Sequence, residues 1–128
     1  VSLSFLQLYR ETIQDLLAPN NSSNGHSNDE NLLIREDPIR GFYVDGLQEY
    51  AVRSYREAEA LINLGLENRA IAPTLMNATS SRSHTILTIS IEQRLTASSQ
   101  KTPQFARTVR SKLLMVDLAG SERVRRTR

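Results

Sequence analysis

The chain has 128 residues, of which 39% are hydrophobic and 23% are charged, and it contains no cysteine. This length and composition are typical of one ordinary globular domain or of a piece of one. The lack of cysteine excludes a disulfide scaffold and a zinc–thiolate site, and suits a reducing compartment. No run approaches the roughly 20 apolar residues that a membrane-spanning helix needs.

The formal net charge of +2 is unevenly distributed along the chain. Residues 1–100 contain eight Lys and Arg against twelve Asp and Glu, whereas residues 101–128 contain eight against two. A basic end on an acidic body predicts an anionic partner, and a solvated arm is the alternative. The chain also opens in a strand pattern and stops in an arginine cluster, as expected of a segment from a longer protein.

The first part of the chain predicts a buried strand, a short helical turn and a polar insertion. Residues 1–9 alternate at first and then become apolar on both sides, which is typical of a well-buried strand. Residues 11–17 place three apolar side chains at helical spacing, which predicts a single turn of helix. Residues 19–31 are almost wholly polar and turn-forming, so we expect a mobile surface insertion there.

The middle of the chain predicts a hairpin followed by a helix. A strand begins at residues 32–34 and ends near 36–38, and a glycine-bounded β segment follows at 41–47. Ser54 and Glu57 then form a capping box, and the apolar spacing behind it predicts a helix to about Arg69 that Pro73 ends.

The last part predicts two strands, at 85–91 and 112–118, joined by a polar link over 96–103. Residues 112–118 are almost continuously apolar, which favours a central strand buried on both faces of an α/β sheet. Asp117 ends this run, and Gly120 follows three residues later. An acid in that place can hold Mg²⁺ and the glycine amide can approach a γ-phosphate, although a plain turn after a strand would explain the pattern as well.

Residues 77–84, NATSSRSH, gather hydroxyls, an amide and a guanidinium between a helix and a strand. Hydroxyl oxygens can bind Mg²⁺ or orient a water, and an arginine can pair with a carboxylate. The alternative is a polar loop with Ser/Thr turns. A Ser/His hydrolase is disfavoured because the sequence has no G-x-S-x-G motif.

These two motifs together resemble the kinesin motor domain. Residues 77–84 are similar to its switch I (N-x-x-S-S-R-S-H), and residues 117–122, DLAGSE, are similar to its switch II. Residues 5–17, FLQLYRETIQDLL, resemble a further family segment, with Gln7 where the family usually carries an acid. The resemblance implies an α/β fold: about half of a kinesin-type P-loop NTPase motor domain, with a central β-sheet flanked by helices.

The resemblance also implies roles for individual residues, with ATP or ADP and Mg²⁺ as cofactors. Ser81 and Asp117 would hold the metal, and Ser80 would hold the attacking water. Asn77 and Gly120 would contact the nucleotide side of the site, with the Gly120 amide sensing the γ-phosphate. Arg82 and Glu122 would form a salt bridge that closes over the nucleotide and helps to relay protons.

The partner that the resemblance implies is the microtubule, whose tubulin is strongly acidic. Residues 123–128 would begin the basic loop that meets it, and the predicted hairpin would make a second contact. The residues concerned are Arg35, Arg40, Tyr43, Arg123, Arg125, Arg126 and Arg128. RNA is a weak alternative partner because only Phe105 lies near the basic tract. Neither nucleic-acid binding nor membrane insertion is expected, and the location implied is the cytoplasm, on the microtubule cytoskeleton.

The function implied is part of an ATP-driven microtubule motor, with a non-catalytic microtubule-binding module as the alternative. The sequence contains no G-x-x-x-x-G-K-[ST] phosphate-binding loop, so this chain alone is expected to be inactive. The full-length protein would carry that loop and dimerise through a coiled coil outside this segment. Without the phosphate-loop strand, residues 113–118 are expected to form an exposed apolar sheet edge, with dimerisation or strand exchange as the consequence.

Overall fold

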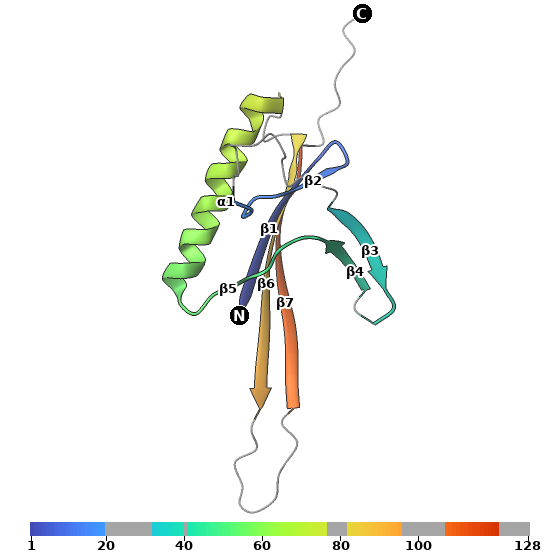
Figure 1. The fold of residues 1–128 in the computed structure, drawn as a ribbon, viewed down its shortest axis with the longest axis vertical. Coiled ribbons are helices and arrows are strands. Elements are labelled where there is room, and N and C mark those ends of the chain that lie inside the picture. Colours follow the sequence, from blue (N-terminus) through green and yellow to red (C-terminus); the bar gives the residue numbers. More distant parts are fainter. Residues whose placement is uncertain (20–31, 40, 77–81, 96–106, 121–128) are drawn as a thin grey trace, which may run out of the picture.

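The structure is a computed structural model that describes residues 1–19, 32–39, 41–76, 82–95 and 107–120 (Figure 1). The predicted insertion at 19–31 and the predicted link at 96–103 therefore lie almost wholly outside the described residues. The elements, in chain order, are β1 (Ser2–Tyr9), β2 (Thr12–Asp15), β3 (Leu33–Asp37), β4 (Gly41–Asp45), β5 (Tyr50–Ala51), α1 (Tyr55–Met76), β6 (His84–Leu95) and β7 (Arg107–Asp117).

The main sheet has the strand order β2-β1-β6-β7, and the short β5 pairs with the start of β1. Every pairing within it is antiparallel. Helix α1 lies along one face of this sheet, while β6 and β7 continue beyond it as a long two-stranded arm (Figure 1). A central sheet with helix on it agrees with the predicted fold class.

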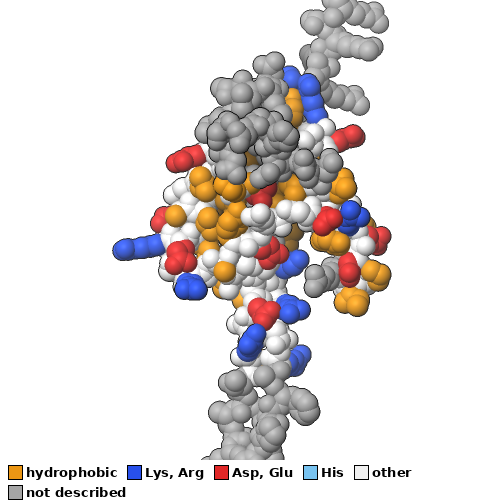
Figure 2. All heavy atoms as spheres, in the orientation of Figure 1, with side chains coloured by type: hydrophobic (Ala, Val, Ile, Leu, Met, Phe, Trp, Pro, Cys, Tyr) orange, Lys and Arg blue, Asp and Glu red, His pale blue; other side chains and the backbone are white. Residues whose placement is uncertain are grey.

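Strand β1 is the buried centre of the molecule, as its apolar pattern predicts. Leu3 and Phe5 are 1% and 5% exposed and belong to a core cluster with Leu16, Leu17 and Leu87. Side chains from the first half of α1 cover this cluster, and apolar side chains gather between the helix and the sheet in Figure 2. Burial of apolar surface therefore fixes α1 against β1.

The helical turn predicted over residues 11–17 is wrong, because Thr12–Asp15 forms β2 and pairs with the end of β1. Arg10 and Glu11 make the two-residue turn between the strands, with φ angles of 47° and 66°. Two consecutive positive φ angles are typical of the type I′ hairpin turn, whose twist matches the flanking strands. Ile13 lies in β2 and Leu16 directly after it, and both are buried through pairing with β1 rather than through a helix face.

Helix α1 begins as predicted and ends later than predicted. The Glu57 backbone N–H donates to the Ser54 hydroxyl at 3.2 Å, and the Glu57 carboxylate accepts from the Arg53 backbone N–H at 2.9 Å. The prediction that Pro73 ends the helix near Arg69 is wrong, because α1 continues to Met76. Proline lacks an N–H for the carbonyl four residues earlier, so this continuation forgoes one helical hydrogen bond.

Strand β7 is the last strand of the described sheet, and it is not buried on both faces as its apolar run predicts. Leu113, Leu114, Met115 and Val116 are between 45% and 55% exposed. An apolar run predicts that a strand is buried only when other elements pack on it and pair with it. Within the described residues, no strand pairs with the free edge of β7. The separate expectation of an exposed apolar edge is confirmed.

Strands β3 and β4 form the predicted hairpin as a separate two-stranded sheet beside the main one (Figure 1). Its register pairs Arg35 with Tyr43 and Ile34 with Val44. Gly41 has a φ of +76°, a conformation that glycine adopts without steric cost.

Candidate functional site

A row of polar side chains crosses the main sheet near the carboxyl end of β7. The strand register places Gln14, Gln7, Thr85 and Asp117 directly opposite one another across β2, β1, β6 and β7. Directly paired residues share a sheet face, and this is the face that carries Phe5 and α1. Gln7 and Thr85 are 4% and 3% exposed, so the row brings buried polar groups up to Asp117.

Arg69 of α1 reaches the end of this row. Its Nη1 donates to Asp117 Oδ2 at 2.9 Å, and the Arg69 side chain is 18% exposed against 64% for Asp117. Gly65, one helical turn earlier, lies over the Phe5 ring. From Gly65 to Arg69 the helix advances about 6 Å, and from Phe5 to Gln7 the strand advances about 6.7 Å. Because these lengths are nearly equal, the packing of Gly65 on Phe5 places Arg69 over Gln7 and the polar row.

Two atoms of this site are buried without a hydrogen-bond partner among the described residues, namely Gln7 Oε1 and Arg69 Nε. Buried polar atoms are usually paired, so these two, one of them in the arginine that contacts Asp117, mark a polar site with unused bonding capacity. Asp117 supplies hard oxygen ligands, and Mg²⁺ is usually held by one or two carboxylates together with substrate phosphates. The residues therefore fit Mg²⁺, which would compete with Arg69 for Asp117.

His84 links the start of β6 to the turn that follows β7. The backbone N–H of Ala119 donates to His84 Nδ1 at 3.0 Å. The last pair of the β6–β7 ladder is Thr85 with Asp117, so this bond lies just beyond the end of the ladder. The end of the predicted switch I is thereby tied to the middle of the predicted switch II.

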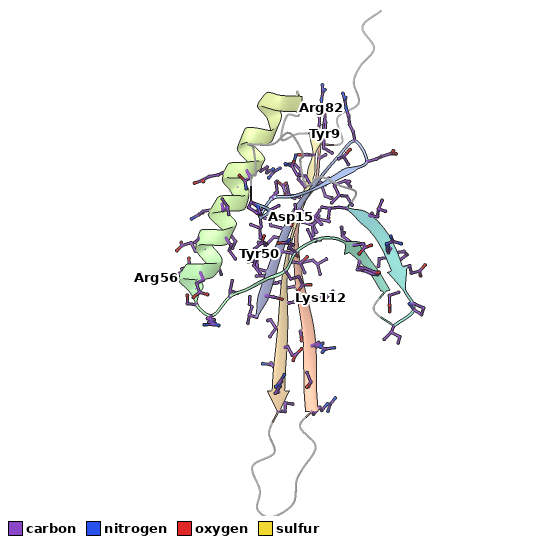
Figure 3. The ribbon with its side chains drawn as sticks, viewed as in Figure 1. Tyr9, Asp15, Tyr50, Arg56, Arg82 and Lys112 are labelled. Atoms are coloured by element: carbon purple, nitrogen blue, oxygen red, sulfur yellow. The ribbon has the colours of Figure 1, made fainter. Side chains whose placement is uncertain are left out.

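The structure describes three of the predicted nucleotide-site residues, and all three lie at one end of the main sheet. Asp117 is the last residue of β7, Gly120 follows three residues later, and Arg82 is exposed just before β6, at the same end of the sheet (Figure 3). The other predicted nucleotide-site residues lie outside the described residues: Asn77, Ser80, Ser81 and Glu122. The salt bridge between Arg82 and Glu122 therefore stays a prediction.

The predicted microtubule-facing residues are described only in the hairpin. Arg35 Nε lies 2.6 Å from Asp45 Oδ2, so an ion pair within the hairpin occupies the Arg35 charge. Tyr43, directly opposite Arg35, is 41% exposed. Apolar side chains gather on the same hairpin, and Ile39 and Phe42 are 96% and 74% exposed (Figure 2). The remaining basic positions lie outside the described residues: Arg40, Arg123, Arg125, Arg126 and Arg128.

Sequence reasoning assigned no role to Arg69 or to the His84 ring, and the structure places both in the site. Arg69 is 48 positions from Asp117, and His84 is 35 positions from Ala119. A lone arginine on a helix is usually solvated, and a backbone amide has no signature in the sequence. The pairing of β6 with β7 brings His84 to Ala119, and the packing of α1 on β1 brings Arg69 to Asp117.

Among the described residues, no three metal-binding side chains cluster into a site that the protein alone would complete. No helix in the described ranges is long and apolar enough to cross a membrane.

Comparison with known proteins agrees with this geometry. Kinesin-related protein 5 of Dictyostelium discoideum is 44% identical over 127 residues, which are 99% of this chain and 11% of that protein. Kinesin-like protein 3 of Schizosaccharomyces pombe is 40% identical, over 97% of this chain and 20% of that protein. The human chromosome-associated kinesin KIF4A is 41% identical over the whole of this chain and 9% of its own length.

A solved structure described as a fast kinesin superposes with a TM-score of 0.80 and 38% identity. The match covers 98% of this chain and 31% of that one, so the chain spans about a third of the solved structure and a smaller share of the curated relatives. The family model for the kinesin motor domain matches residues 1–128. The chain therefore belongs to the kinesin motor domain family.

Proposed function

We propose that the chain is the switch-bearing part of an ATP-driven microtubule motor. The observation that carries the proposal is the meeting of segments 82–84 and 117–120 at one end of the sheet, where His84 bonds to Ala119 and Arg69 to Asp117. Two loops that meet at the carboxyl end of a strand can close on one ligand and so behave as a two-state switch.

Asp117 is the group that would hold Mg²⁺, with Ser81 as the second protein ligand. Mg²⁺ bound with ATP supplies the charge that neutralises the phosphate oxygens during transfer. In the structure Asp117 forms an ion pair with the Arg69 guanidinium. Arg69 thus orients the carboxylate, and a cation held by Asp117 would compete with this ion pair.

The remaining roles follow the switch motifs. Ser80 positions the attacking water, Asn77 supports switch I, and the Gly120 amide contacts the γ-phosphate, which a Cβ at that position would obstruct. Arg82 pairs with Glu122 when both loops close. Because its two partners come from different loops, the pair can form only when both loops are closed, so it links the state of one loop to that of the other. Removing one partner of a desolvated pair typically costs about 3–5 kcal/mol.

The microtubule surface consists of the β3–β4 hairpin and residues 123–128. Because Asp45 pairs with Arg35, the hairpin offers mainly the exposed side chains of Ile39, Phe42 and Tyr43. Arg40 and the arginines of 123–128 supply the charge that attracts acidic tubulin and makes binding sensitive to salt. The site of action is then the cytoplasmic microtubule.

The test is the microtubule-stimulated ATPase of the full-length protein with Ser81→Ala or Glu122→Ala. Both variants are expected to lose at least tenfold in kcat, and matched changes at exposed positions, Ser111→Ala and Glu67→Ala, are expected to lose less than twofold. Near-normal turnover in the two site variants would remove the assigned roles. Wild-type protein that sediments with microtubules but never hydrolyses ATP would support the non-catalytic module instead.

The 128-residue chain by itself is a second test. Its sequence has no G-x-x-x-x-G-K-[ST] motif, so it lacks the backbone cradle and the lysine that bind phosphates. We expect neither tight ATP binding nor turnover from the purified chain. Measurable microtubule-stimulated hydrolysis by these 128 residues would contradict the assignment of the phosphate site to another segment.

A further inference from the structure

We infer that His84 is a positioning residue that couples the two switch segments through the backbone of Ala119; the inference rests on the proposed function. The bond runs from the Ala119 backbone N–H to His84 Nδ1 at 3.0 Å. Nδ1 accepts here, so the imidazole carries its proton on Nε2. His84 therefore acts on the nucleotide site through a backbone amide, and it needs no contact with the nucleotide.

The position of this hydrogen bond allows it to restrict the backbone of the turn after β7. Backbone pairing between β6 and β7 stops at Thr85 and Asp117, and residues 118–120 belong to no strand. The side chain of His84 replaces the next rung of the ladder by holding the amide two residues beyond Asp117. The following amide, that of Gly120, is the proposed γ-phosphate sensor, and fixing the Ala119 N–H restricts the path of the backbone into it.

The coupling works in both directions because one hydrogen bond joins the two segments. Movement of residues 82–84 pulls on Ala119, and rearrangement of residues 118–120 pulls on His84. A side chain–backbone hydrogen bond typically contributes enough to change an equilibrium about two- to tenfold. We therefore expect loss of the bond to lower microtubule-stimulated kcat by about three- to tenfold, without abolishing turnover.

The experiment compares three substitutions in the full-length protein. His84→Ala removes the acceptor, whereas the Oδ1 of His84→Asn lies at about the place of Nδ1 and His84→Gln carries its polar atoms farther out, near Nε2. Microtubule-stimulated kcat is expected to fall in the Ala and Gln variants and to stay within twofold of wild type in the Asn variant. Because the microtubule surface is not involved, the KM for microtubules is expected to change by less than twofold in all three.

Hydrogen–deuterium exchange of the peptide that spans residues 118–120 gives a readout that does not require activity. Faster exchange there in the Ala and Gln variants, with wild-type exchange in the Asn variant and in β1 peptides, supports the coupling. An Asn variant that matches the Ala variant in both assays overturns it, and so do three variants that match wild type. Wild-type protein without microtubule-stimulated ATPase would refute the proposed function, and exchange would still decide the role of His84.

Discussion

Substituting Gly65 by alanine tests whether close packing of α1 on β1 positions the candidate site. Gly65 is buried in the helix face that meets the sheet. A Cβ added there would lie 2.8 Å from Phe5 Cε1 and closer still to Phe5 Cδ1. Phe5 is 5% exposed within the core cluster, so its ring cannot turn aside freely.

Two opposing effects set the size of the change in stability. Replacing glycine by alanine in a helix interior is worth about 1 kcal/mol in favour of folding. Overpacking a well-filled core costs about 1–3 kcal/mol. The clash outweighs the gain in helix propensity, so we expect a net loss in the free energy of unfolding of about 1 kcal/mol. Arg69 follows one turn later on the same helix face, so displacement of α1 would also lengthen its bond to Asp117.

Chemical and thermal unfolding of the 128-residue chain measure this loss. Asn63→Ala is the matched control, because Asn63 is exposed on the same helix and the change should stabilise by a few tenths of a kcal/mol. Adding Phe5→Leu to the Gly65→Ala variant should relieve the clash and reveal a favourable coupling between the two sites. A Gly65→Ala chain more stable than wild type by about 1 kcal/mol would refute the packing argument.

Three other predictions concern groups outside the candidate site. The Tyr50 hydroxyl donates to the Leu17 carbonyl oxygen at 3.1 Å, so Tyr50→Phe should cost about 1 kcal/mol in unfolding experiments, and an unchanged midpoint would contradict this. Burial, with a smaller contribution from Asp15, raises the pKa of Tyr50. The stability that Tyr50 contributes is therefore complete below the ordinary tyrosine pKa and is lost as pH rises through the raised value. The hydrogen bond from Arg110 lowers the pKa of Glu92, and Arg110→Ala should return it towards the usual range in an NMR titration; a pKa that stays low would count against the pairing. The pairing contributes stability above the ordinary glutamate pKa that is lost as pH falls through the lowered value. The free apolar edge of β7 should make the 128-residue chain self-associate with rising concentration, and light scattering that shows a monomer throughout would argue otherwise.

Patterns confined to neighbouring residues predicted much of the fold. The buried pattern of residues 1–9, the hairpin near Arg35 and the capping box at Ser54 depend on short-range chemistry, and the structure has all three. The errors occurred where distant residues decide the outcome. Residues 11–17 become a hairpin arm because β1 lies beside them, and α1 passes Pro73 although local sequence favours an end there.

The sequence offered candidate ligands for the site, but it did not predict the contacts that support them. The acid–glycine spacing predicted Asp117 and Gly120 as site residues, and in the structure Asp117 ends β7 while Gly120 lies three residues beyond it. The partner of that acid is Arg69, a residue whose sequence context matches any amphipathic helix. The Arg69–Asp117 pair forms because α1 packs on β1 and β7 pairs in register with β6. Neither arrangement can be seen in the local sequence.

The β6–β7 arm has a mechanical consequence. Eleven consecutive residue pairs, from Thr85 with Asp117 to Leu95 with Arg107, join the two strands without interruption. Such a ribbon is roughly 34 Å long at the usual rise per residue. A slip by one residue between β6 and β7 would turn every β7 side chain to the opposite face of the sheet and take Asp117 away from Arg69, so the strands resist sliding past each other. A displacement of the far end of the arm along its length would therefore reach Asp117 with the pairing of the two strands unchanged.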